Sequence, residues 1–127
     1  MEIDHLDHLV LTVADIARTV AFYEQVLGME VITFGAGRKA LKFGNQKINL
    51  HQKGRELDPK AAHPAPGTAD MCFITRTPVA LVLAELNALN IDILEGGIVS
   101  RTGAQGPILS VYFRDPDLNL IELSNYV

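Results

Sequence analysis

The sequence predicts an α+β fold built from two tandem βαβββ modules, and three observations support this prediction. Short β-rich runs alternate with segments whose apolar residues recur at helical spacing. The same order of runs occurs twice along the 127 residues. A shared offset at several landmarks indicates an internal repeat even where few letters match. The landmarks that recur 62 positions later are His8 and Asp70, Asp15 and Thr77, and Gly28 and Asn90.

The first half begins with residues 8–14, which alternate between two faces as a strand does. Asp15 is suited to cap the N-terminus of the helix that follows, and Gly28 is suited to end it in the left-handed conformation. The later runs are separated by glycine-containing turns and predict three further strands. These strands are expected at residues 29–34, 39–43 and 47–52.

The second half repeats this order. A strand over 70–75 is followed by Thr77 as the expected N-cap and by Pro78 at the first helical position. Asn90 stands where the helix ends, and asparagine tolerates the left-handed conformation. Strands are expected at residues 91–94, 107–113 and 118–125. The glycine-rich stretch 96–106, which carries Arg101 and Gln105, is expected to be either a functional loop or lid or a plain surface connection.

We therefore expect one domain over 1–127. Module one spans about 4–52, a Pro-rich and charged linker spans 53–67, and module two spans 68–127. Each sheet must bury one face against its helix, so the other face is free. We expect the two free faces to form a cup-shaped mixed sheet with the helices outside.

Composition excludes several classes of protein. The chain is 48% hydrophobic and 20% charged, with a net charge of −4, and its 11 Lys and Arg form no dense cluster, so a nucleic-acid partner is not expected. No apolar run is long enough to span a membrane, and the acidic start does not resemble a secretory signal. A single cysteine, Cys72, fits a reducing compartment, so we expect a cytoplasmic protein.

Four polar residues on separate strands are expected on the free faces. They are His8, His51, Asp70 and Glu122, and either histidine taken alone is also typical of a hydrogen-bonded surface residue. Glu122 is the strongest, because a carboxylate within an apolar strand is costly to bury unless it is paired or bound to a metal. Imidazole and carboxylate ligands together suit Zn, Ni, Mn or Fe. We expect these residues to converge on a divalent metal.

Two segments carry a resemblance to a known superfamily. DHLVLTVADI…FYEQVLGMEV at 7–31 and FRDPDLNLIEL at 113–123 resemble the opening and the closing hairpin of the vicinal oxygen chelate superfamily. That superfamily includes glyoxalase I, extradiol dioxygenases, and bleomycin- and fosfomycin-resistance proteins. RKALKFGNQKINLH, PKAAHPAPGTAD and RTGAQGPILSVYFRDPDLNLIELSNY look like the subgroup of glyoxalase domain-containing protein 5 and its bacterial relatives.

The resemblance implies roles for individual positions. His8 matches the ligand of the first strand, and Glu122 matches that of the last strand. Asp70 departs from the pattern, because many relatives place a histidine there. Asn49 occupies the place of a glutamate ligand of glyoxalase I, with His51 two residues later. Tyr112 matches a pocket tyrosine of the dioxygenases and of the fosfomycin enzymes, although a packed hairpin tyrosine is an equal alternative.

The function that we expect is that of a divalent-metal-dependent lyase or isomerase of the glyoxalase type. Glu122 would move a proton, Tyr112 would donate a hydrogen bond, and Arg101 and Arg114 would bind an anionic part of a small oxygen-chelating substrate. One alternative is an Fe(II) ring-cleavage dioxygenase, which Asp70 disfavours. Another is a metal-free binding or resistance protein. We also expect a homodimer.

Overall fold

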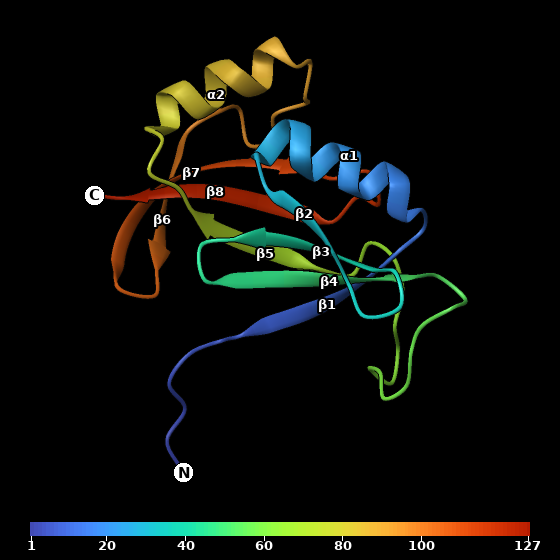
Figure 1. Cartoon of the computed structure of the whole chain (residues 1–127). Coiled ribbons are helices and arrows are strands. Elements are labelled where there is room, and N and C mark those ends of the chain that lie inside the picture. Colours follow the sequence, from blue (N-terminus) through green and yellow to red (C-terminus); the bar gives the residue numbers. More distant parts are fainter. The chain divides into compact units, whose positions relative to one another are not determined.

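The computed structural model describes all residues, 1–127, and forms two compact units, Met1–Gly67 and Thr68–Val127. The fold is α+β, and each unit contains one helix and one four-stranded mixed sheet in βαβββ order, as predicted (Figure 1). The first unit contains β1 (His8–Val13), α1 (Ile16–Leu27), β2 (Glu30–Phe34), β3 (Arg38–Phe43) and β4 (Gln46–Gln52). The second contains β5 (Asp70–Ile74), α2 (Val79–Ala88), β6 (Val99–Gly103), β7 (Gly106–Arg114) and β8 (Leu120–Tyr126).

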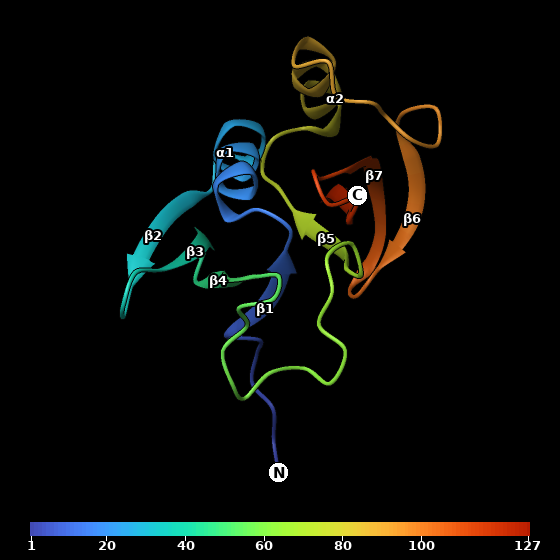
Figure 2. The same cartoon turned by 90° about the vertical axis from the view of Figure 1, so that its right-hand side faces the viewer.

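The two sheets have the same topology. Their strand orders are β1-β4-β3-β2 and β5-β8-β7-β6, so the first strand of each unit pairs with the last. This pairing is parallel in both units, and the remaining pairs are antiparallel. In each unit the helix connects the first strand to the far edge of the sheet, and Figure 2 shows each sheet with its helix on one side.

One face of each sheet is apolar and packs against the helix of its own unit. In the first unit Leu11, Val13 and Ile48 lie on this face and are buried, together with Tyr23 of α1. In the second unit Val111 and Ile121 lie on the equivalent face. The alternation predicted for β1 is thereby confirmed, and the even-numbered side chains of β1 lie on the opposite face.

Helix α1 begins and ends as predicted. The Asp15 side chain accepts a hydrogen bond from the backbone N–H of Arg18 at 3.2 Å, and Gly28 adopts φ 66°. Gln52 of β4 adds a second contact, because its Oε1 accepts from the N–H of Ile16 at 3.1 Å. Its Nε2 donates to the carbonyl of Ala14, so β4 secures the start of the helix.

The prediction that Thr77 caps α2 is wrong. Pro78 occupies the N-cap position and no residue of the segment supplies a side-chain cap. Asn125 of β8 does so from a distance: its Oδ1 accepts from the N–H of Val79 at 2.8 Å, and its Nδ2 donates to the carbonyls of Thr75 and Thr77. In α2 this long-range contact takes the place of a local cap such as Asp15 provides in α1. Asn90 adopts φ 58° beyond the helix, as predicted.

The strand expected at 91–94 is absent, and β6 lies instead within the segment for which the sequence predicts a loop. Positive φ values at Asn90, Glu95, Gly96 and Gly97 turn the chain on both sides of 91–94. Only the N–H of Leu94 reaches β7 there, donating to the carbonyl of Tyr112 at 2.9 Å. Residues 99–103 pair with β7, so Arg101 lies on a strand rather than on a lid.

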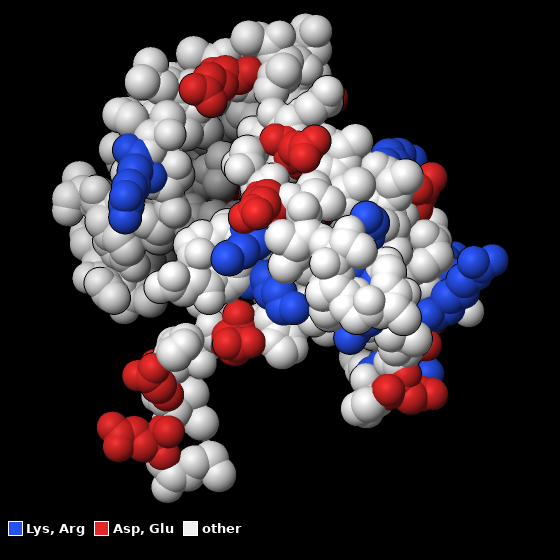
Figure 3. Space-filling model, viewed as in Figure 1, with Lys and Arg blue, Asp and Glu red and all other residues white.

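None of the helices is both long and apolar enough to cross a membrane. On the face shown in Figure 3, acidic and basic side chains are interspersed. The extended segment before β1 carries Glu2, Asp4 and Asp7. These acidic groups belong to the first unit and lie outside its sheet.

Candidate active site

The first unit places His8, Asn49 and His51 on the face of its sheet opposite α1. The β1–β4 register pairs His8 with Lys47, and Thr12 with His51. The two histidines are therefore four strand positions apart, or about 13 Å along the sheet. The unit thus brings both predicted residues to one face but does not place their rings side by side.

His8 carries a feature that suits a metal-binding histidine. Its Nδ1 lies 2.8 Å from Oδ2 of Asp7, and this contact holds the pKa of Asp7 below its usual value. A carboxylate on one ring nitrogen of histidine orients the ring and leaves the other nitrogen for a ligand. Nε2 is therefore the atom of His8 that is available to an ion.

Asn49 is the second unusual group of this face. It is 5% exposed, and its Oδ1 has no hydrogen-bond partner within the protein. Its register relates it to Glu122, because Asn49 pairs with Val10 as Glu122 pairs with Cys72. Val10 and Cys72 are 62 positions apart, the offset of the repeat. The structure thus makes Asn49 the counterpart of Glu122.

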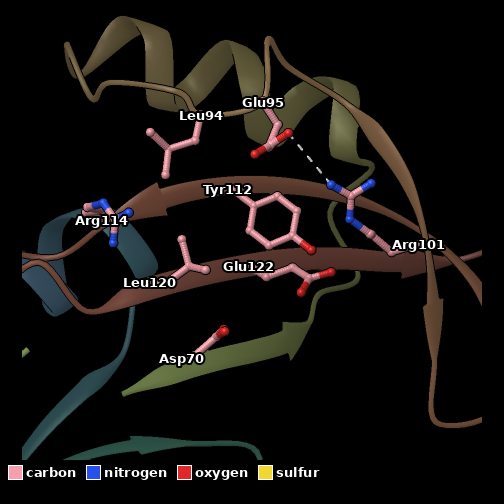
Figure 4. A pocket seen from close by; sticks show the side chains of 8 residues that line it. All are labelled: Asp70, Leu94, Glu95, Arg101, Tyr112, Arg114, Leu120 and Glu122. Carbon is pink, nitrogen blue, oxygen red and sulfur yellow. Dashed lines mark ion pairs between the residues drawn. The ribbon is translucent and has the colours of Figure 1, made fainter. Parts of the chain in front are cut away.

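The second unit contains a pocket of about 310 Å³ on the sheet face opposite α2. All five site residues that were predicted for this unit line it, and their side chains are drawn in Figure 4. β5, β6, β7 and β8 each contribute at least one of them. The lining consists of Asp70, Leu94, Glu95, Arg101, Tyr112, Arg114, Leu120 and Glu122.

Cationic groups stand on both sides of the central Tyr112 in this pocket (Figure 4). The Arg101 guanidinium lies 5.4 Å from the centre of the Tyr112 ring, and its Nη2 lies 3.9 Å from a carboxylate oxygen of Glu95. Arg114 donates from Nη1 to the carbonyl of Leu118 at 3.1 Å. Neither arginine is fully neutralised by these contacts, so both remain able to bind an anion.

Tyr112 remains a hydrogen-bond donor over a wide pH range. Burial raises the pKa of its phenol, the neighbouring Glu122 carboxylate raises it further, and Arg101 opposes both effects. Tyr112 and Glu122 are direct cross-strand partners. The pocket thus places a protonated phenol beside a carboxylate.

Glu122 is held by two serines that sequence reasoning missed. Ser110 Oγ lies 2.5 Å from Glu122 Oε2, and Ser124 Oγ lies 3.3 Å from the same oxygen. The available signal was parity, because both serines share the strand face of Glu122 and Tyr112 within otherwise apolar runs. Glu95 was also missed, because the sequence indicates only a loop around it.

Each unit carries donor atoms of the kinds that divalent cations take. Asp70 and Glu122 offer carboxylate oxygens in one pocket, His8 offers a nitrogen, and Asn49 has an unpartnered amide oxygen. Oxygen-rich sets with one imidazole suit Mn or Fe, and they suit Zn and Ni as well. In the described chain, 1–127, no three His, Cys, Asp or Glu side chains form a ready-made cluster. The convergence of His8, His51, Asp70 and Glu122 stays a prediction.

Comparisons with known proteins identify relatives along the whole chain. Virulence protein STM3117 of Salmonella typhimurium is 59% identical over 127 residues, covering 100% of this chain and 88% of the relative. Its crystal structure matches with a TM-score of 0.98 over 100% of both chains. Glyoxalase domain-containing protein RDO1 of Mycosarcoma maydis is 55% identical, covering 99% of this chain and 70% of the relative.

A more distant structure carries a ligand. A mutant of the fosfomycin resistance protein FosX from Listeria monocytogenes, complexed with Mn(II) and 1S,2S-dihydroxypropylphosphonic acid, is 25% identical. It matches with a TM-score of 0.64 over 96% of this chain and 90% of that chain. The model of the glyoxalase/bleomycin resistance protein/dioxygenase superfamily matches residues 5–123. The chain therefore belongs to this superfamily.

Proposed function

We propose that the chain is a divalent-metal-dependent lyase or isomerase of the glyoxalase type, acting on a small anionic substrate with two adjacent oxygens. The observation that carries this proposal is the pocket of the second unit. It combines a carboxylate held by hydroxyl groups, a protonated phenol and two guanidinium groups. Such a set binds an anion and moves a proton.

The ion would be Zn, Ni, Mn or Fe, and the residues proposed to hold it are His8, Asp70 and Glu122, with Asn49 and His51 as further candidates. The bound ion supplies Lewis-acid stabilisation of negative charge on a substrate oxygen. The Mn(II) complex of the FosX mutant supports an ion of this kind, since that protein shares the fold.

The protein side chains have separate tasks in this proposal. Glu122 accepts a proton from the substrate carbon next to the chelating oxygens and returns it at the neighbouring position. Tyr112 donates a hydrogen bond to the oxygen on which charge develops. Arg101 and Arg114 bind the anionic group and orient the substrate.

A thermal-shift screen of the full chain with each of the four ions tests the proposal. An ion that binds only the folded state at 100 times its Kd adds about 2.7 kcal/mol, which corresponds to a rise of about 10 °C in Tm. The absence of any shift, together with an ion-free purified protein, would overturn the proposal. Retention of iron with catechol binding under anaerobic conditions would favour a ring-cleaving dioxygenase instead.

We also propose a homodimer. Val10 on the edge strand β1 and Ile74 on the edge strand β5 are 44% and 55% exposed, and such edges pair readily with a second copy. Light scattering coupled to size exclusion tests this, and a monomer at micromolar concentration would contradict it.

A further inference from the structure

Two buried hydroxyl groups lie behind the carboxylate of the pocket. Ser110 on β7 and Ser124 on β8 are both 0% exposed and are direct cross-strand partners. Burying a hydroxyl costs free energy unless it is hydrogen-bonded, and alanine or valine would fill these strand positions without that cost. The placement of two serines here therefore requires a physical reason beyond packing.

The hydrogen bonds of the serines converge on one atom. Ser110 Oγ donates to Glu122 Oε2 at 2.5 Å, and Ser124 Oγ lies 2.7 Å from Ser110 Oγ and 3.3 Å from Oε2. A hydroxyl carries a single hydrogen, and an ionised carboxylate only accepts. Because Ser110 gives its hydrogen to Oε2, the single hydrogen of Ser124 lies between two acceptors, Ser110 Oγ at 2.7 Å and Glu122 Oε2 at 3.3 Å.

The direction of the chain extends one step further. Cys72 Sγ lies 3.4 Å from Ser124 Oγ, and Ser124 has already committed its hydrogen. The thiol of Cys72 is then the donor of that contact. All donors run in one direction, from Cys72 through Ser124 and Ser110, and end on Glu122. This arrangement stabilises the ionised carboxylate in one orientation.

The two serines contact the same oxygen of Glu122. Both serine contacts are to Oε2, so Oε1 is free of them, and the residue lines the pocket. When one oxygen of a carboxylate is fixed by hydrogen bonds, its other oxygen lies at a defined place. Groups behind a metal ligand commonly orient the ligand in this way. Asn49, the counterpart in the first unit, has no such support for its Oδ1.

We propose that Ser110 and Ser124 are positioning residues that hold Oε2 of Glu122 and thereby present Oε1 to the ligand of the pocket. This inference rests on the proposed function, because it assigns Glu122 to ligand binding. It predicts that each serine acts through Glu122 and has no separate effect on the ligand.

The test is a double-mutant cycle on the full chain with Mn²⁺ as the probe. Isothermal titration gives the Mn²⁺ Kd of the wild type, Ser110→Ala, Ser124→Ala and Glu122→Gln, and of each serine variant combined with Glu122→Gln. Each serine variant alone is expected to weaken binding by about tenfold or more. In the Glu122→Gln background the same changes are expected to matter less than about twofold. Ser100→Ala, an exposed serine on β6, is the matched control.

A metal-free readout separates this inference from the proposed function. The infrared carboxylate band of Glu122 is identified as the band that is lost in Glu122→Gln. It is expected to shift in Ser110→Ala and in Ser124→Ala, and not in Ser100→Ala. An unmoved band, or an equal loss of Mn²⁺ affinity in both backgrounds, would overturn the positioning role. A wild-type chain that binds none of the four ions would overturn the proposed function, while the band would still decide how the carboxylate is held.

Discussion

The two units share one topology but carry different side chains, with different hydrogen bonds, at one equivalent position. Asn49 on β4 and Glu122 on β8 occupy equivalent places, paired with Val10 and Cys72 on the first strand of each unit. Glu122 is held by two buried hydroxyl groups, whereas Oδ1 of Asn49 is buried without a partner. The second unit therefore presents a carboxylate held in one orientation, and the first presents an amide oxygen without a hydrogen-bond partner. A repeat thus preserves the backbone while its polar side chains diverge.

The helix caps show the opposite behaviour. Gln52 and Asn125, which are 73 positions apart like Asn49 and Glu122, use their amide groups in the same way at the start of α1 and α2. Structural polar contacts are therefore repeated, and the contacts of the site are not. The predictions below test this division, beginning with the largest effect.

The largest effect is expected from Glu122→Gln. This change removes the charge while keeping the shape, and it should weaken Mn²⁺ binding by about 100-fold, or about 2.7 kcal/mol. Isothermal titration measures the change. Glu85→Gln, an exposed carboxylate on α2, is the control and should bind as the wild type does. Equal affinities of Glu122→Gln and the control would remove Glu122 from the site.

The caps come next, and their effect should be on stability alone. Asn125→Ala removes one hydrogen bond from the start of α2 and two from the segment that leads into it, and α2 has no side-chain cap of its own. We therefore expect a loss of about 2 kcal/mol in the free energy of unfolding. Gln52→Ala should cost only about 1 kcal/mol, because Asp15 still caps α1. Urea unfolding measures both. A larger cost for Gln52→Ala would contradict the comparison of the caps.

The smallest effect is expected at Asn49. Replacing it with leucine of similar shape removes a buried oxygen that has no partner, so the free energy of unfolding should rise by up to about 1 kcal/mol. The same variant should bind Mn²⁺ more weakly if the oxygen serves a ligand. Urea unfolding and titration measure the two quantities. A clear loss of stability would show that Oδ1 is satisfied in solution.

Much of the fold could be predicted because local sequence patterns indicate most of its elements. Alternation indicated the strands, and Asp15, Gly28 and Asn90 marked helix ends that the structure confirms. The cap of α2 could not be predicted, because Asn125 lies 46 residues beyond Val79 in the sequence. The β6 strand was missed because its glycine-rich surroundings resemble a loop.

The residues predicted for the second unit line its pocket. Alternation placed Glu122 on the free face, the internal repeat placed Asp70 there, and the family resemblance indicated Tyr112; the pocket of the second unit contains all three. The serines behind Glu122 were not found, because alternation puts them on the face of Glu122 but serine at such a position does not by itself indicate a role in the site. Their role appears only in the hydrogen bonds between β7 and β8.

The most direct test is nuclear magnetic resonance of the ¹⁵N-labelled full chain titrated with substoichiometric Mn²⁺. Because Mn²⁺ is paramagnetic, it broadens the amide signals near its binding site. The pocket of the second unit should respond first, at Asp70, Tyr112 and Glu122, and Glu122→Gln should abolish this response. Broadening confined to the acidic segment before β1, and unchanged in Glu122→Gln, would contradict the account.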